Sequence, residues 1–185
     1  MPSLQDVRRI VWLRTDRLGE TLLNLPAVAA LKAALPGTAL TFVVHPDLRD
    51  LLTAARGVDR VLPYREGEGR WWVARAFRLA KTLRSHRFDL AIVSNPKKEL
   101  HLAVWLAGIP RRAGYARKWG RWLLTHRVDD RKALGERHEV EYILTWSGPL
   151  ACRRPSPSGS CHALTVSKLK FSNCFSSRGL SHLRR

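Results

Sequence analysis

The sequence predicts an α/β domain built on a mainly parallel sheet. Short apolar runs rich in β-branched residues alternate with segments whose apolar positions recur at helical spacing, which is the pattern of βαβ units. The chain of 185 residues is long enough for one ordinary domain. Its composition of 45% hydrophobic and 26% charged residues is typical of a globular core rather than of disorder.

The first βα unit is expected near the start of the chain. Residues 8–13 form a short apolar run typical of a buried strand, and a polar loop follows it. Apolar residues at helical spacing predict a helix over 19–35, which ends at Pro36 and Gly37 because these residues stop helices. Pro26 either kinks this helix or marks its restart.

The following units are read in the same way. A second strand is predicted at 39–44, a short helix at 47–55, and a third strand at 59–63, before a glycine-rich loop. A longer helix is predicted over 71–85, and the residues expected to share its core-facing side are Trp72, Ala76, Phe77, Ala80 and Leu83. The remaining predicted elements are a strand at 88–93, a helix at 97–107, a strand at 111–115 and a helix at 137–146. Ligands bind beyond the carboxyl ends of parallel strands, so functional loops are expected after residues 13, 44, 63 and 93.

The charge is strongly basic. Lys and Arg number 33 against 15 Asp and Glu, a net charge of +18 that favours anionic partners such as nucleic acid, anionic lipid or a phosphorylated substrate. No segment reaches the roughly 18 consecutive apolar residues of a transmembrane helix. We therefore expect a cytoplasmic protein that is soluble or peripherally bound to a membrane.

The character of the chain changes near residue 146. Residues 147–185 contain no acidic residue and show no sustained period, and all three cysteines lie there at a spacing that matches no zinc site. We expect an organised domain over residues 1–146 and a basic tail over residues 147–185 that is disordered or read out of frame. Translation of the other two frames beyond codon 145 would test the frame hypothesis, and genuine truncation is the alternative.

The segment after the first strand is the most informative for function. Residues 14–20 join a buried strand to a helix N-terminus, where backbone N–H groups favour anions. The segment lacks the G-x-G-x-x-G of dinucleotide sites and the Gly-Lys-Ser/Thr ending of a phosphate-binding loop. One interpretation is purely structural: Asp16 caps the helix, Glu20 complements its dipole, and Arg14 and Arg17 are solvated.

The same segment resembles the opening of glycosyltransferase family 9, the lipopolysaccharide heptosyltransferases. That family begins with a strand, an R-x-D-x-x-G-D turn and a helix carrying T-x-P-A, and the residues here are RTDRLGETLLNLPAVAALKAALPGTALTFVVHP. Further similar segments follow in the family's order: VDRVLPY, LRSHRFDLAIV, LAGIPRRAGY, LLTHRV and HEVEYIL. The resemblance covers residues 8 to about 145, and it is the order and spacing of the motifs that make it specific.

The resemblance implies a GT-B fold, in which two Rossmann-like domains face each other across a cleft. Residues 1–146 correspond to the N-terminal domain, which receives the sugar acceptor, and the donor-binding domain has no counterpart in the sequence. The implied reaction transfers a sugar from an ADP-heptose-like donor to a lipopolysaccharide core acceptor with inversion, without a cofactor or a catalytic metal. Because donor and acceptor must be held together, we expect no sugar transfer by the 185-residue chain alone.

The resemblance also implies roles for individual residues. The family's catalytic carboxylate corresponds to Glu20, where Asp is usual, and it acts as general base on the acceptor hydroxyl. The extra methylene of Glu moves the carboxylate by roughly an ångström, and a misplacement of that order can cost about 100-fold in rate. The residues expected to bind the acceptor are Arg14, Asp16, Arg17, Lys97 and His138, and Asp16 is also the second candidate for the base.

The implied partners are anionic. They are the lipopolysaccharide core or another anionic glycolipid, and the cytoplasmic face of the inner membrane. Trp71, Trp72 and Trp105 are expected in the core or at an interdomain surface, while Trp119 and Trp122 among basic neighbours would also suit a membrane interface. The alternative function is a basic module that binds nucleic acid or another anionic ligand without catalysis, although no zinc finger, RNA-binding aromatic motif or helix-turn-helix signature indicates specific nucleic-acid binding.

Overall fold

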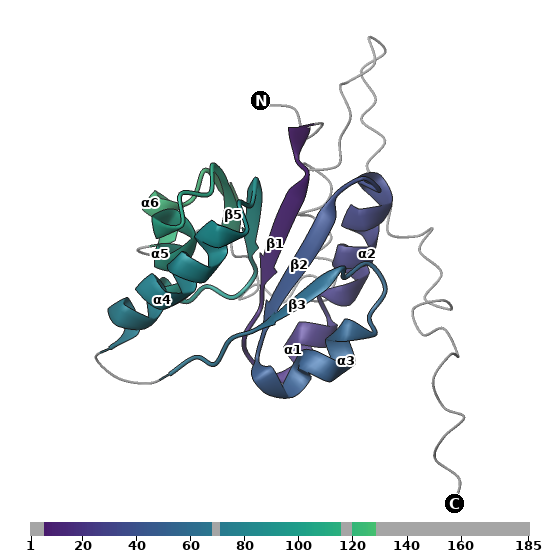
Figure 1. Ribbon diagram of the computed structural model, residues 1–185, viewed down its shortest axis with the longest axis horizontal. Coiled ribbons are helices and arrows are strands. Elements are labelled where there is room, and N and C mark those ends of the chain that lie inside the picture. Colours follow the sequence, from purple (N-terminus) through teal and green to yellow (C-terminus); the bar gives the residue numbers. More distant parts are fainter. Residues whose placement is uncertain (1–5, 68–70, 116–119, 129–185) are drawn as a thin grey trace, which may run out of the picture.

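The structure is a computed structural model that describes residues 6–67, 71–115 and 120–128 (Figure 1). These residues form one parallel sheet with helices on both faces, which is a Rossmann-like α/β fold. The fold class predicted from the sequence is therefore confirmed. The predicted helix at 137–146, the tail at 147–185 and the three cysteines lie outside the described residues.

The sheet has six strands among the described residues, in the order β3-β2-β1-β4-β5-β6. Every neighbouring pair is parallel. The strand bounds are β1 (Arg9–Leu13), β2 (Ala39–Val44), β3 (Arg60–Pro63), β4 (Leu90–Val93), β5 (Arg111–Tyr115) and β6 (His126–Val128). The five predicted strands are confirmed. Sequence reasoning missed β6, because three residues of mixed polarity give no strand pattern.

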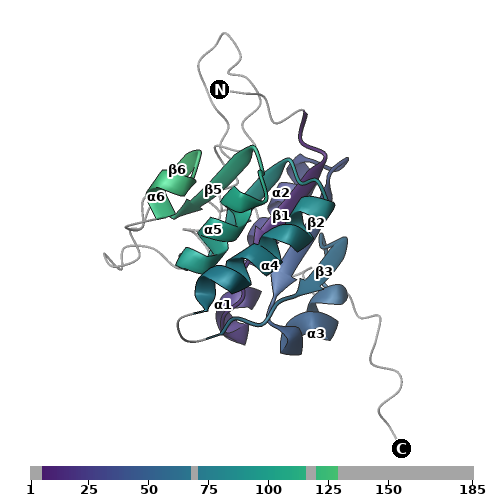
Figure 2. The same cartoon turned by 60° about the vertical axis from the view of Figure 1, so that its left-hand side comes forward.

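Helices cover the two faces separately (Figure 2). Their bounds are α1 (Leu18–Leu22), α2 (Leu25–Ala34), a 3-10 turn (Pro46–Leu48), α3 (Arg49–Thr53), α4 (Trp72–Ser85), α5 (Lys98–Leu106) and α6 (Gly120–Leu123). Buried residues of α2 and α3 join one apolar cluster, and those of α4 and α5 join the other. In β1, Ile10 and Trp12 belong to the first cluster, whereas Val11 and Leu13 belong to the second. The strand is apolar throughout because both of its faces are covered.

The predicted helix over 19–35 is two helices. Helix α1 ends at Leu22 and α2 begins at Leu25, with Pro26 in the first turn of α2. A proline is tolerated there because the N–H groups of the first helical turn make no intrahelical hydrogen bond, so the missing N–H of proline costs none. Of the two interpretations of Pro26, the restart is confirmed.

The buried side of α4 differs from the predicted one at Phe77 and at Trp72, which is only partly buried. Ala76, Ala80 and Leu83 are buried as predicted, but Phe77 is 55% exposed and Leu79 is buried instead. Buried positions three or four residues apart define one stripe of the helix, and Phe77 lies beside that stripe. The placement of Phe77 in the core is therefore wrong.

We predict that Leu83→Ala lowers the free energy of unfolding by about 2–5 kcal/mol, because it empties a fully buried position in the core. Phe77→Ala should change it by less than about 0.5–1 kcal/mol, because much of that ring is already in water. Urea unfolding followed by circular dichroism measures both values. A larger loss for Phe77→Ala than for Leu83→Ala would show that the described orientation of α4 is wrong.

Candidate functional site

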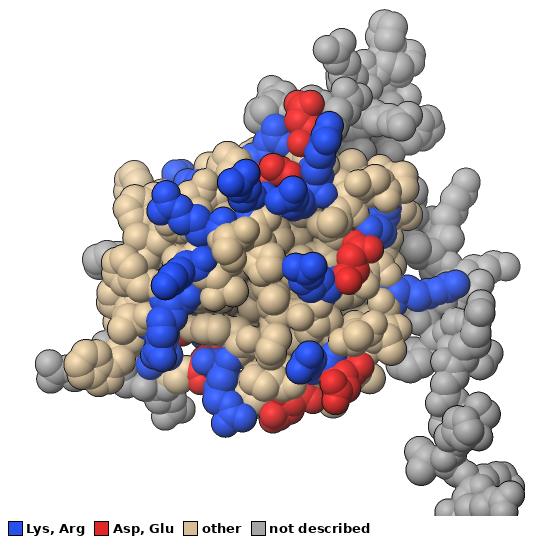
Figure 3. All heavy atoms as spheres, viewed as in Figure 1, with Lys and Arg blue, Asp and Glu red and all other residues tan. Residues whose placement is uncertain are grey.

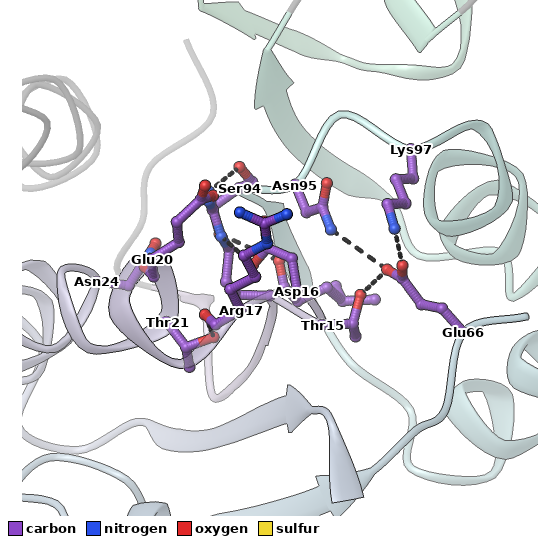
Figure 4. A network of polar contacts seen from close by, with 12 residues as sticks. Thr15, Asp16, Arg17, Glu20, Thr21, Asn24, Glu66, Ser94, Asn95 and Lys97 are labelled. Carbon is purple, nitrogen blue, oxygen red and sulfur yellow. Dashed lines mark hydrogen bonds and ion pairs between the residues drawn. The ribbon is translucent and has the colours of Figure 1, made fainter. Parts of the chain in front are cut away.

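The strand order reverses between β1 and β4, and this reversal places the candidate site. The chain leaves β1 toward α1 and α2, and it leaves β4 toward α5 on the other face of the sheet. Open parallel sheets bind ligands beyond the carboxyl ends of the strands at such a switch point. Residues 14–20 and 94–97, which the sequence predicted as functional loops, meet there (Figure 4).

Arg14 is the charged residue at the centre of this site. It follows β1 directly and is only 1% exposed. Its Nη1 donates to the carbonyl oxygen of Ser94 at 2.7 Å, and its Nε donates to Oδ1 of Asp16 at 2.7 Å. Its Nη2 donates to Oε2 of Glu20. Because removing an ion from water costs several kcal/mol, a buried guanidinium needs partners of this kind. Arg14 thus ties the loop after β1 to the end of β4 and to α1.

Glu20 is the carboxylate best placed to react with a ligand. It lies in the first turn of α1, and its side chain is 45% exposed although one oxygen is held by buried Arg14. The side chain of Asp16 is 20% exposed and is engaged by the Nε of the same guanidinium. A carboxylate with a fixed direction and an open side can accept a proton from a hydroxyl brought within hydrogen-bond reach.

Neutral hydrogen bonds hold the start of α1 in position. Asn24, in the break between α1 and α2, donates from Nδ2 to the carbonyl oxygen of Glu20 at 2.6 Å. Its Oδ1 accepts from Nε1 of Trp12 at 3.1 Å, and the same indole N–H lies 3.1 Å from Oγ of Ser94. The break in the helix therefore puts the Asn24 side chain where it links β1 to the residue that carries the exposed carboxylate. The Trp12 indole extends this link to Ser94, after β4.

A second carboxylate lies beside this pair. Glu66, on the segment after β3, accepts at Oε1 from the Thr15 hydroxyl and, at 3.2 Å, from Nδ2 of Asn95. Its Oε2 accepts from Nζ of Lys97. Thr15 and Asn95 are both buried, whereas the side chain of Lys97 is 52% exposed. Two segments far apart in the sequence, the loops after β1 and β4, thus converge on a carboxylate carried by a third segment (Figure 4).

A third carboxylate anchors the neighbouring elements. Buried Glu99 of α5 accepts from the Tyr64 hydroxyl and pairs with Nη2 of Arg75 at 3.2 Å. Burial, and then the hydrogen bond to Glu99, raise the pKa of Tyr64 far above its ordinary value, so the phenol keeps its proton. Within the residues that the structure describes, no three His, Cys, Asp or Glu side chains are grouped to hold a metal ion.

His101 supports the start of α5 from the buried side. Its Nδ1–H donates to the carbonyl oxygen of Lys97 at 2.8 Å. Its Nε2 has no hydrogen-bond partner among the described residues, and a Cβ added at Gly120 would lie only 3.0 Å from that atom. Burial therefore lowers the pKa of His101 below its ordinary value.

The structure brings together most of the residues that the sequence singled out. Arg14, Asp16 and Glu20 form one cluster, and Lys97 lies in the adjacent Glu66 cluster. Arg17 is exposed, and it contributes its carbonyl oxygen to the backbone N–H and the hydroxyl of Thr21. His138 lies outside the described residues.

The purely structural interpretation of the loop after β1 is wrong on two points. The N-cap position of α1 is Arg17 and makes no side-chain cap hydrogen bond, so Asp16 does not cap the helix. Arg14 is buried rather than solvated. Sequence reasoning also missed Thr15, Asn95 and Glu66. The signal that could have found Thr15 and Asn95 is their position, two residues after the ends of strands whose following loops were predicted to be functional.

The chain is similar to known glycosyltransferases both in sequence and in fold. No family profile matches the chain. A Haemophilus influenzae protein with the provisional name of glycosyltransferase is 28% identical over 136 residues, which are 74% of this chain and 38% of that protein. ADP-heptose lipopolysaccharide heptosyltransferase II of Escherichia coli is similar in structure, with a TM-score of 0.63 and 22% identity over 76% of this chain and 40% of that one. A family 9 glycosyl transferase of Veillonella parvula gives a TM-score of 0.69 and 20% identity over 77% and 41%.

The fold is that of a Rossmann-like domain of the kind found in GT-B glycosyltransferases. More particularly, the chain resembles glycosyltransferase family 9, with Escherichia coli heptosyltransferase WaaC giving a TM-score of 0.62 and 20% identity over 84% of this chain and 51% of that one. The resemblance seen in the motifs is confirmed, in sequence by a glycosyltransferase and in fold by the heptosyltransferases. The chain spans about two fifths of the length of the curated relative that it matches.

We predict that stability falls between pH 7 and pH 5 partly through His101. Its folded-state pKa is lowered, so its contribution is fully present above the unfolded-state pKa of about 6.5 and is lost as the pH falls below it. Urea unfolding at pH 5, 6 and 7 should show a flatter pH dependence for His101→Gln than for the unchanged chain. Equal slopes for the two proteins would contradict the prediction.

Proposed function

We propose that this chain is the acceptor-side domain of a glycosyltransferase of heptosyltransferase type. The observation that carries the proposal is the Glu20 carboxylate, half-exposed and held by buried Arg14 at the switch point of a parallel sheet. Similarity to a glycosyltransferase in sequence and to heptosyltransferases in fold supports it. The donor would be an ADP-heptose-like nucleotide sugar, and the acceptor a lipopolysaccharide core.

In the proposed reaction Glu20 takes the proton from an acceptor hydroxyl. The hydroxyl oxygen then forms a bond to the anomeric carbon of the donor as the bond from that carbon to the nucleotide breaks, and the nucleotide leaves with the electron pair. One displacement of this kind inverts the anomeric centre. Arg14 contributes by fixing the direction of the Glu20 carboxylate, since a misplacement of about an ångström can cost about 100-fold in rate. No step in this scheme uses a cofactor or a metal.

The acceptor side of the proposal rests on the cations at the same edge of the sheet. Arg17 is exposed next to Glu20, and Lys97 is half-exposed in the neighbouring loop. Exposed basic groups at the same edge of the sheet as the carboxylate suit the phosphate and carboxylate groups of an anionic sugar acceptor. The 185-residue chain alone should therefore bind such an acceptor without turning it over.

We predict that Glu20→Gln lowers kcat for sugar transfer by at least about 100-fold, because general-base catalysis contributes 10²–10⁴-fold. Glu20→Asp should retain activity, since it keeps the proton acceptor. The assay joins residues 1–146 to the donor-binding domain of a family 9 heptosyltransferase and follows transfer from ADP-heptose. A loss of less than tenfold in Glu20→Gln, or a larger loss in Asp16→Asn, would show that Glu20 is not the base.

We also propose that the domain contacts an anionic membrane surface through α4. None of the described helices is long and apolar enough to cross a bilayer. Helix α4 contains no acidic residue, it exposes Arg78, Lys81 and Arg84, and it presents Phe77 and the preceding Trp71, which is 76% exposed. Lys and Arg side chains gather over the side of the molecule where α4 lies (Figure 3). Exposed aromatic rings beside cations are typical of segments that lie in a lipid headgroup region.

We predict that the double change Trp71→Ala and Phe77→Ala weakens binding to vesicles that contain phosphatidylglycerol by roughly tenfold or more, because each ring contributes buried apolar area. Co-sedimentation at fixed ionic strength measures the binding. Leu51→Ala removes an exposed apolar side chain on α3 and serves as the matched control. Equal losses in the two proteins, or equal binding to uncharged vesicles, would contradict contact through α4.

A further inference from the structure

The cluster around Glu66 has the composition of an anion-binding site. Its donors are the Thr15 hydroxyl, the Asn95 amide and the Lys97 ammonium group, and all three contact one carboxylate. Thr15 and Asn95 are buried, and each is the second residue after one of the two central strands, β1 and β4. Two neutral donors and one cation around a pair of oxygens would serve a phosphate or a ligand carboxylate equally well.

The donors are placed by the backbone and not by Glu66 alone. The N–H of Lys97 donates to the carbonyl oxygen of Asn95 at 2.8 Å, which closes a tight turn through Pro96. Thr15 follows Arg14, whose backbone N–H donates to the carbonyl oxygen of Val43 at 3.0 Å. Both donor segments are therefore held by the sheet edge, and they would keep their positions if the carboxylate moved away.

Glu66 is held differently. It lies on the connection after β3, which is held by other contacts before and after it. Two residues earlier, the Tyr64 hydroxyl donates to Glu99, and in the next residue the carbonyl oxygen of Gly67 accepts from Nη2 of Arg75. Because these contacts hold the flanking chain, rotation of the Glu66 side chain alone would vacate the cluster. Lys97 is half-exposed, so the vacated position is open to solvent on that side.

We propose that Thr15, Asn95 and Lys97 form a subsite for a phosphate or carboxylate group of the ligand, and that Glu66 occupies this subsite as an internal anion that the ligand displaces. The proposal rests on the proposed function, because it names the group of the acceptor that the subsite binds. Glu66 then also weakens ligand binding, because a tethered carboxylate competes with the ligand for the three donors at an effective concentration of roughly millimolar. Only an anion that matches all three donors displaces it.

The test uses the 185-residue chain with inorganic phosphate as the probe and acetate as the carboxylate probe. Glu66→Ala removes the internal anion and should bind phosphate about tenfold or more tightly than the unchanged chain, as measured by calorimetry or by shifts of the Asn95 amide signals in NMR spectra. Asp47→Ala is the matched control, because it removes an exposed carboxylate on the loop after β2 with the same change in net charge. It should change the affinity by less than about threefold. The stronger of the two probes then identifies the anion class.

Two further variants decide between an anion-binding site and a contact of Glu66 that only stabilises the fold. Adding Lys97→Ala or Thr15→Val to Glu66→Ala should abolish the gain in phosphate affinity. If Glu66→Ala binds phosphate no more tightly than Asp47→Ala, the proposal is wrong. If Glu66→Ala and Glu66→Gln both fail to fold, Glu66 is required for folding and the proposal is likewise wrong.

Failure of this inference can be told apart from failure of the proposed function. Phosphate binding requires neither a sugar acceptor nor Glu20. A chain that gains phosphate affinity in Glu66→Ala but does not bind lipopolysaccharide core oligosaccharide would keep the subsite and refute the acceptor. A chain that binds the oligosaccharide equally well with and without Glu66 would keep the proposed acceptor and refute the subsite.

Discussion

The burial of the Arg14 guanidinium is the constraint on which the site depends. A charged group that is almost fully removed from water must have its donors satisfied, and here the acceptors come from the end of β4, from Asp16 and from Glu20. Ser94 lies 80 residues further along the chain than Arg14. The Arg14 guanidinium finds all these acceptors only when β1 is paired with β4, and the same contacts fix the direction of the Glu20 carboxylate. The site therefore depends on the completed sheet.

The parallel sheet explains why such distant residues share one edge. All the strands described run in the same direction, so the loops that follow β1, β3 and β4 emerge on the same side. The order reversal sends the chain from β1 and from β4 to opposite faces, which keeps the space above these two strands free of a crossing helix. Trp12, Asn24 and Ser94 then fill the layer below with neutral hydrogen bonds. That layer positions α1 without adding another buried charge.

The pattern of apolar residues was enough to predict the strands, the fold class and the loops that carry the site. It worked because residues such as Ile10 to Leu13 are covered on both faces, which leaves an uninterrupted apolar run. It failed at Phe77, where an aromatic residue fits the helical spacing but lies beside the buried stripe. It also failed for Glu66, because a carboxylate in a glycine-rich loop looks like any solvated loop residue. Its three partners become visible only when the sheet brings the ends of β1 and β4 together.

The distribution of charge separates attraction to polyanions in general from recognition at the site. Although the chain carries a net charge of +18, Arg14, Arg75 and Lys97 at the carboxyl edge of the sheet are each paired with a carboxylate. Cations on the exposed side of α4 have no acidic residue on their own helix. Non-specific attraction to nucleic acid or lipid should therefore arise largely at surfaces such as α4, and it should weaken steeply with salt. An anionic group at the subsite of Thr15, Asn95 and Lys97 must instead replace the Glu66 carboxylate. The selectivity of this subsite for a ligand depends on how well the ligand's oxygens match the positions of the donors. The net charge of the chain does not provide such a match.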